Sequence, residues 1–166
     1  MQSVEEKVGL PLVARADARL FILGSLPGDA SLAAGRYYAH PQNQFWRLVG
    51  SVIGEDLHAL PYEARLDRLA ERRIGLWDVI GSAVRQGSLD QAIRHANHNR
   101  IEQLVHDFPE LEAVAFNGGT SANIGRKLIG SGHRLTLIDL PSSSPANTRP
   151  LAEKAAAWAQ LQPFCG

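Results

Sequence analysis

The chain contains four short runs of apolar residues, and each run stops at a glycine, an asparagine–glycine pair or a proline. The runs span Leu20–Leu23, Ile74–Ile80, Ala113–Phe116 and Leu135–Leu140. Runs with little alternation between polar and apolar positions are typical of strands that are buried on both faces, as in a parallel sheet. The pattern therefore predicts four strands that end near Gly24, Gly81, Asn117 and Pro141.

The segments between these runs have helical spacing. Between Phe45 and Ile53 apolar residues recur at intervals of three and four, and Pro61 can open a helix that reaches about Arg72. Further helical stretches are predicted at 101–105, 120–128 and 151–161. Alternating strands and helices predict one domain over residues 1–166, a three-layer α/β/α fold with a four-stranded parallel sheet. Ligands of such sheets bind beyond the carboxyl ends of the strands.

The longest of these strand-end segments, Gly24–Trp46, carries most of the candidate chemistry. Gly24 and Ser25 open a glycine- and proline-rich turn in which the backbone can approach a ligand closely. Tyr38 is predicted to stack on a nucleobase. Phe45 is assigned to the same base contact, although it could instead begin the core of the next helix, as we expect of Trp46.

Two polar residues of this segment have competing interpretations. Asn43 precedes a predicted helix and suits the N-cap position, a role that is compatible with catalysis. His40 precedes a proline, and we expect a structural role for it rather than proton transfer.

The third and fourth strand ends supply the remaining candidates. Asn117 offers an amide donor and acceptor that could read a base edge, or it could serve a tight turn. The loop after Pro141 is rigid and made of small residues. Its hydroxyl and N–H groups suit phosphate contacts, and the candidate DNA-binding residues are Ser142, Ser143, Ser144, Ala146 and Asn147.

Composition narrows the function classes. The formal net charge is zero, which counts mildly against a nucleic-acid partner. The arginine clusters, and the His95–His98 pair with its metal-like spacing, are expected on solvated helix faces. Cys165 is the single cysteine, so we expect no disulfide, zinc cluster, iron–sulfur cluster or other cofactor. We expect no membrane span, and Met1–Val8 lacks the apolar core of a signal peptide, which favours the reducing cytoplasm.

Taken together, the strand-end motifs resemble the uracil-DNA glycosylase superfamily. Gly24-Ser-Leu-Pro-Gly28 is similar to its first motif and Leu140-Pro-Ser-Ser-Ser-Pro-Ala-Asn147 to its second. Ala39–Trp46 and Phe116–Gly118 are similar to stretches of its mismatch-specific branch. The combination of Tyr37-Tyr-Ala-His-Pro41 with the serine-rich motif is closest to the hypoxanthine (deoxyinosine) branch. The resemblance covers about residues 20–158 and implies the same four-stranded fold.

Two residues or groups of residues depart from the superfamily motifs, and these departures bear on which residue is catalytic. Leu26 stands where many members carry the Asp or Asn that handles the attacking water, and serines replace a histidine of the second motif. The resemblance to the hypoxanthine branch implies that Asn43 is the catalytic residue that orients the water. Asp29 is the second candidate if the water needs a true base. The lone cysteine excludes the branches that hold an iron–sulfur cluster.

The expected function is therefore a monofunctional, monomeric DNA glycosylase that acts on double-stranded DNA with a deaminated base, hypoxanthine in particular. The enzyme would flip the nucleotide out of the duplex before it hydrolyses the N-glycosidic bond. Two alternatives remain open: a mismatch-specific uracil or thymine glycosylase, and a noncatalytic nucleotide- or DNA-binding α/β module.

Overall fold

A four-stranded parallel sheet forms the centre of the computed structural model, which describes residues 5–166. Its strands are β2 (Leu20–Gly24), β3 (Ile74–Asp78), β6 (Ala113–Asn117) and β7 (Thr136–Leu140), in the order β3-β2-β6-β7. All three strand pairs are parallel. The predicted parallel sheet is thus confirmed.

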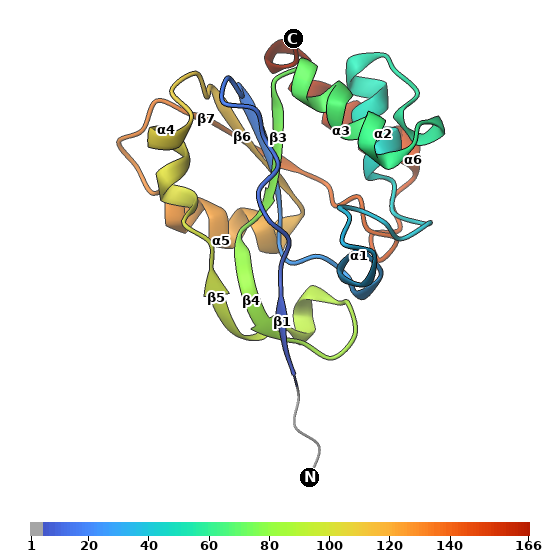
Figure 1. Ribbon diagram of the computed structural model, residues 1–166, viewed down its shortest axis with the longest axis vertical. Coiled ribbons are helices and arrows are strands. Elements are labelled where there is room, and N and C mark those ends of the chain that lie inside the picture. Colours follow the sequence, from blue (N-terminus) through green and yellow to red (C-terminus); the bar gives the residue numbers. More distant parts are fainter. Residues whose placement is uncertain (1–4) are drawn as a thin grey trace.

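Helices cover both faces of this sheet (Figure 1). One face carries α2 (Phe45–Ile53), α3 (Tyr62–Glu71) and α6 (Leu151–Trp158), and the other carries α4 (Leu104–Asp107) and α5 (Gly119–Ile129). The predicted three-layer α/β/α arrangement is confirmed. Four 3-10 turns complete the helical segments, at Leu57–Ala59, Asp90–Ala92, Ile101–Gln103 and Ala159–Phe164.

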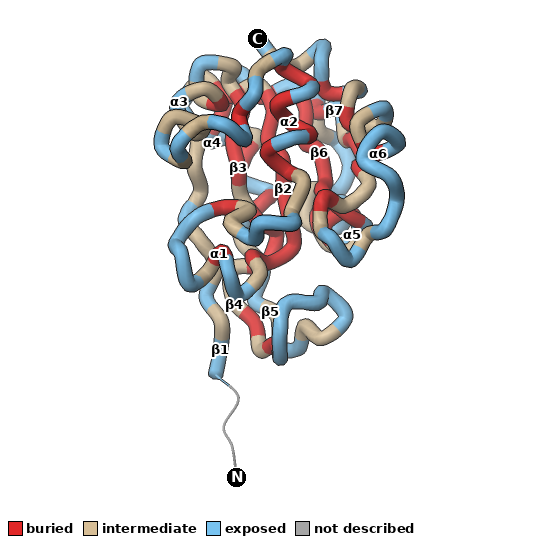
Figure 2. The backbone as a smooth tube through the Cα atoms, turned by 90° about the vertical axis from the view of Figure 1, so that its right-hand side faces the viewer, coloured by how far each residue is buried: buried red, intermediate tan, exposed pale blue. Residues whose placement is uncertain are grey.

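Strand β2 shows why the central runs of the sequence contain so few polar residues. Leu20 and Ile22 pack into the core beneath α2 and α6, whereas Phe21 and Leu23 pack into the core beneath α4 and α5. Figure 2 shows the buried residues concentrated along β2 and β6 in the middle of the molecule. A strand covered on both faces must be apolar at every position.

A second, antiparallel sheet was not predicted. It consists of β1 (Glu6–Val8), β4 (Ile80–Val84) and β5 (Arg94–His98), in the order β1-β4-β5. The apolar run that predicted one strand over Ile74–Ile80 is therefore divided between two sheets. Val79 donates its backbone N–H to the Gly24 carbonyl at 2.9 Å, and the chain then leaves the parallel ladder. Val79 and Ile80 are buried like most of β3, so the apolar pattern does not reveal the break.

The same sheet corrects the expectation for the histidine pair. His95 and His98 lie on β5, not on a helix face, and both are exposed.

A short helix, α1 (Asp29–Ala34), interrupts the long segment after β2. It ends at Gly35, whose φ of 65° lies in the left-handed region that favours glycine. This helix positions the chain for the residues that follow, which turn back toward the sheet as the loop before α2.

Within residues 5–166, no helix has the length and apolar composition needed to cross a bilayer. The expectation for Met1–Val8 rests partly on residues 1–4, which lie outside the described part of the chain.

Candidate active site

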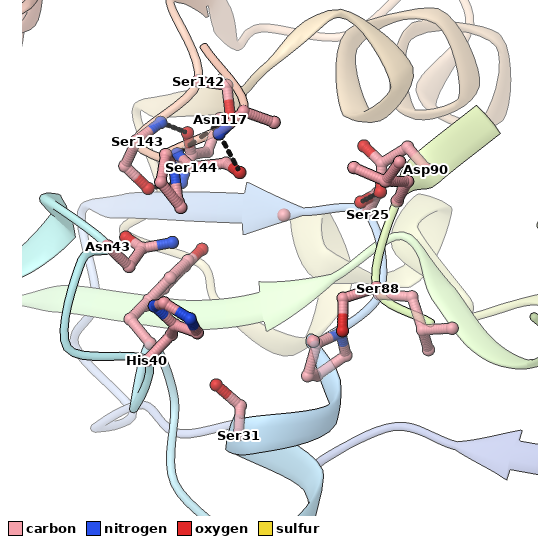
Figure 3. A pocket seen from close by; sticks show the side chains of 18 of the residues that line it. Ser25, Ser31, His40, Asn43, Ser88, Asp90, Asn117, Ser142, Ser143 and Ser144 are labelled. Atoms are coloured by element: carbon pink, nitrogen blue, oxygen red, sulfur yellow. Dashed lines mark hydrogen bonds between the residues drawn. The ribbon is translucent and has the colours of Figure 1, made fainter. Parts of the chain in front are cut away.

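A cavity of about 830 Å³ opens at the carboxyl ends of the parallel strands. This volume lies within the range of about 300–1,000 Å³ that is usual for small-molecule sites. Figure 3 shows His40 and Asn43 along one wall and Asn117 with the serines along another, with Ser25 and Asp90 further along. The cavity brings together every predicted site residue except Phe45.

The first wall is the turn after β2, and a buried arginine fixes its shape. The Arg85 guanidinium donates to the carbonyls of Pro27 at 2.8 Å, Gly87 at 2.7 Å and Leu26 at 3.3 Å. Its side chain has no exposed surface. Two of these carbonyls belong to the turn after β2 and the third to the segment after β4, so one cation holds both segments in place. Sequence reasoning missed this residue, because no local signal separates it from exposed arginines.

The segment after β4 forms part of the rim and was also missed. Ser25 donates its hydroxyl to Asp90 at 2.6 Å, and Ser88 accepts the backbone N–H of Asp29 at 2.9 Å. These contacts fasten the rim to the turn after β2.

Tyr38 enters the cavity from the loop before α2. Its backbone φ is 55°, an uncommon conformation for a residue with a side chain. Its ring stacks on Phe45, with centroids 3.8 Å apart and planes 12° apart. Phe45 has no exposed surface and lies behind Tyr38 rather than on the cavity wall. One face of the Tyr38 ring is thus covered, and a base can stack only on the other.

Asn43 lies just before α2 and faces the cavity. Its side-chain oxygen accepts the backbone N–H of Phe45, the first residue of α2, at 2.9 Å. The N-cap expectation is wrong by one residue, because Gln44 holds the N-cap position and Asn43 precedes it. The second lone pair of that oxygen and the NH2 group remain for a ligand or a water. Trp46, in the first turn of α2, is buried in the core as expected.

Asn117, at the end of β6, holds the serine-rich loop in place. Its amide nitrogen donates to the Ser143 hydroxyl and its oxygen accepts the Ser143 backbone N–H, both at 2.9 Å. Ser143 is almost completely buried. One N–H of the Asn117 amide remains for a base, whereas Ser143 is too enclosed to meet a phosphate directly.

The other residues of the serine-rich loop are more accessible. Ser142 accepts the backbone N–H of Ser144, and Ser144 accepts that of Ala146, both at 3.1 Å. Asn147 donates to the Ser142 carbonyl at 3.1 Å. The hydroxyl oxygens of Ser142 and Ser144 are thus acceptors within the loop, and their hydrogens stay available to donate to a phosphate.

A buried lysine connects this loop with the loop before α2. Lys154, on α6, donates to the Gln44 side-chain oxygen and to the Asn147 carbonyl, both at 2.9 Å. The backbone N–H of Gln44 donates to the Ser143 carbonyl at 3.0 Å. Burial lowers the pKa of Lys154. This junction, which the sequence did not suggest, keeps Asn43 and the serine-rich loop in a fixed relation.

Asp29 lies on the cavity wall but is committed to ion pairs. It contacts Lys7 at 2.6 Å and Arg85 at 3.5 Å. The hydrogen bond from Lys7 lowers the pKa of Asp29. A carboxylate with a lowered pKa is a weaker base, so this geometry makes Asp29 less suited to deprotonating a water.

Asp78, which ends β3, also lines the cavity and was not predicted as a site residue. It is buried, and its Oδ2 atom has no hydrogen-bond partner. Sequence reasoning missed it because the strand was expected to continue to Gly81. Within residues 5–166, no group of three or more His, Cys, Asp or Glu side chains gathers in an arrangement that could hold a metal ion.

Comparisons with known proteins agree with this geometry. The sequence model of the uracil DNA glycosylase superfamily matches residues 11–162. The chain belongs to this superfamily. It is 41% identical over 155 residues to a protein of Methanosarcina barkeri named hypoxanthine DNA glycosylase, covering 93% of this chain and 97% of that protein. A protein of the same name from Methanosarcina acetivorans is 40% identical over 152 residues, with coverages of 92% and 95%.

A solved structure also matches the whole fold of this superfamily member. It is a solution NMR structure of a protein from Methanosarcina acetivorans that is provisionally named a uracil DNA glycosylase. The TM-score is 0.86 at 38% sequence identity, and the match covers 96% of this chain and 99% of the other. The resemblance inferred from the strand-end motifs is confirmed.

Gly24 gives a direct test of how tightly this uracil DNA glycosylase superfamily site is packed. A Cβ at this position would lie 2.5 Å from Oδ1 of Asp78 and 3.1 Å from the Tyr38 hydroxyl. Gly24→Ala is therefore expected to displace both side chains and to slow base excision roughly 10²-fold, the cost that a misplacement of about 1 Å can have. Single-turnover excision assays measure the effect.

Gly28→Ala in the same turn is the matched control. Its new Cβ would meet Ser88 at an ordinary 3.5 Å, and its φ of −66° suits alanine. We expect this variant to retain the excision rate. Equal losses in the two variants would show that the turn, not the contact with Asp78 and Tyr38, is what alanine disturbs.

Proposed function

We propose that the protein is a monofunctional DNA glycosylase that removes a deaminated base, hypoxanthine from deoxyinosine in particular, by hydrolysis of the N-glycosidic bond. One observation carries the proposal. Asn43, held by the start of α2, faces a cavity that is large enough for a nucleoside and is bordered by the serine-rich loop. The names of the two archaeal relatives support the same base.

The chemistry follows from the charges that develop as the bond breaks. Positive charge grows on the sugar and negative charge on the departing base, so groups placed in advance at those positions lower the barrier. Asn43 orients the water at the sugar carbon, because an amide can position a water but hardly deprotonate it. The hydrogen bond that its side-chain oxygen accepts from the Phe45 N–H fixes the direction of the amide.

The base is held by aromatic and polar groups of the cavity. Tyr38 offers its uncovered ring face for stacking, with Phe45 as the support behind it. The remaining N–H of Asn117 and the turn at Gly24 and Ser25 lie at the edge of the base.

The DNA backbone is bound by the serine-rich loop. Ser142 and Ser144 donate their hydroxyl hydrogens to the phosphates beside the flipped nucleotide. Ser143 acts from behind, through its two bonds to Asn117. Ala146 and Asn147, at the far end of the loop, approach the gap that the base leaves in the duplex.

We further propose that the partner is double-stranded DNA, that the protein acts as a monomer, and that it works in the cytoplasm. The lone cysteine supports a reducing compartment, since it can form no disulfide within the chain. Sedimentation of the protein with and without duplex DNA tests the monomer.

The substrate is tested with four duplexes that differ in one base pair and contain inosine, uracil, xanthine or a thymine mismatch. The free base is quantified under single-turnover conditions. We expect the inosine duplex to react fastest. Fastest release of uracil or thymine would favour the mismatch-specific alternative, and binding without any release would favour a noncatalytic module.

A further inference from the structure

Two side chains that line the cavity each carry a buried polar atom without a hydrogen-bond partner. These atoms are the Tyr38 hydroxyl and Oδ2 of Asp78. The Asp78 carboxyl and the Tyr38 hydroxyl both approach the same face of Gly24, where a Cβ would lie 2.5 Å from Asp78 Oδ1 and 3.1 Å from the hydroxyl. Native proteins rarely leave such atoms unpaired, and each case calls for a functional or structural explanation. A ligand in the cavity would supply the missing partners.

The surroundings of Asp78 favour the protonated form of its carboxyl up to about pH 7. Burial, and then the negative charge of Asp90, raise its pKa to about 7, and Arg85 opposes the shift. Arg85 forms its hydrogen bonds with the carbonyls of Leu26, Pro27 and Gly87 and with Asp29, not with the Asp78 carboxyl.

The other groups that face Asp78 are tyrosines. Burial raises the pKa of Tyr37 and of Tyr38, so both phenols stay protonated throughout the neutral range. Within the cavity, Asp78 is thus a carboxylic acid in an apolar setting that can give up a proton near pH 7. The same combination, a buried acid with a pKa near the working pH, suits general acid catalysis.

We infer that Asp78 is a second catalytic residue, the general acid that protonates the departing purine at N7. This inference rests on the proposed release of hypoxanthine. The second motif of this chain carries serines, none of which is an acid, so no side chain of that loop can supply this proton. Asp78 enters the site from the carboxyl end of β3, which is the edge strand opposite β7 in the parallel sheet.

The proton transfer balances as follows. The O–H bond of the Asp78 carboxyl breaks and an N7–H bond forms, while the electron pair of the bond from the sugar carbon to N9 stays with the base. Hypoxanthine leaves as a neutral molecule. The water oriented by Asn43 forms the new bond to the sugar carbon and loses a proton, which returns through solvent to the Asp78 carboxylate.

Asp78→Asn keeps the shape of the side chain and removes the transferable proton. The assay follows single-turnover release of hypoxanthine from an inosine duplex between pH 5.5 and 8.5. The wild-type rate is expected to fall as pH rises through about 7, because the carboxyl loses its proton. The variant is expected to be slower at pH 6 by about 10²-fold or more, the usual contribution of general acid catalysis, and to lack the decline above pH 7.

Two further measurements separate catalysis from structure. A duplex with 2′-fluoro-2′-deoxyinosine, which resists cleavage, should bind wild type and Asp78→Asn within about threefold of each other. Folded Asp78 has a raised pKa, so the wild type loses stability as pH rises from about 4 to about 7. The variant is neutral throughout and should lose that part of the pH dependence in urea unfolding.

Three results would overturn the inference. They are a variant that reacts within threefold of wild type at pH 6, a variant that retains the decline above pH 7, and a wild-type rate that rises through pH 7. The last would indicate an ionised Asp78 that accepts a hydrogen bond from the base. If the wild type releases no hypoxanthine at any pH, it is the proposed function that fails, and that outcome is distinct from all three.

Discussion

Replacement of Asn43 is expected to slow hypoxanthine release by about 10²–10³-fold, the cost of losing one group placed for the transition state. Asn43→Ser is the informative change, because a serine hydroxyl can also accept the Phe45 N–H in place of the amide. The helix start should therefore remain while the group that orients the water is lost. The rate is measured under single-turnover conditions on an inosine duplex.

Asn43→Ala separates the two roles of this residue further. It also removes the acceptor of the Phe45 N–H, and it should cost about 1 kcal/mol of stability in addition to the loss of rate. Gln42→Ala, at an exposed neighbouring position outside the cavity, is the control and should leave both unchanged. A fully active Asn43→Ser would show that Asn43 only holds the start of α2 and that another group orients the water.

Arg85→Leu is expected to destabilise the protein by about 3 kcal/mol. Each buried carbonyl that loses its donor costs roughly 1–3 kcal/mol, and relief from burying the guanidinium offsets part of the sum. Three carbonyls of the turns that border the cavity lose their donor at once. Urea unfolding measures the stability, and the excision rate is expected to fall in the same variant because the turn after β2 loses its support.

Arg134→Leu is the matched control, since this exposed arginine makes a single bond to the Pro109 carbonyl, outside the cavity. Its stability should change by less than about 0.5 kcal/mol. An unchanged stability in Arg85→Leu would mean that water replaces the guanidinium at no cost and that the turn does not depend on it.

The central sheet could be predicted because β2, β3 and β6 are buried on both faces, although the edge strand β7 is partly exposed. Positions that are buried on both faces are apolar throughout, as Leu20–Leu23 shows. The small sheet could not be predicted in the same way. Val79 and Ile80 are as apolar as the strand before them, so the point where the chain changes sheets depends on a backbone bond to Gly24 that has no sequence signal.

The parts of the candidate site that could be predicted are those in which several unusual residues stand close together in the sequence. The segment around Tyr38 and Asn43 and the serine-rich loop both line the cavity. Asp78, Arg85 and Lys154 were missed, because each is an ordinary charged residue in the sequence and becomes exceptional only when the fold buries it. Burial of a charge is decided by segments far apart in the chain, which a single sequence does not bring together.

The structure also assigns more specific contacts to two predicted base-binding residues. Phe45 supports the Tyr38 ring from behind instead of lining the cavity. Both the nitrogen and the oxygen of the Asn117 amide form hydrogen bonds with Ser143, so the main role of Asn117 is to position the serine-rich loop. Both act through a neighbour, a relation that residue type and spacing alone do not reveal.

The most direct test of the proposed activity is to incubate the wild-type protein with a duplex that contains one deoxyinosine and to analyse both products. A monofunctional glycosylase is expected to release one equivalent of free hypoxanthine, detected by mass, and to leave an abasic strand that breaks only after alkali treatment. A duplex that is bound but releases no base, or a strand that breaks without alkali, would contradict the account.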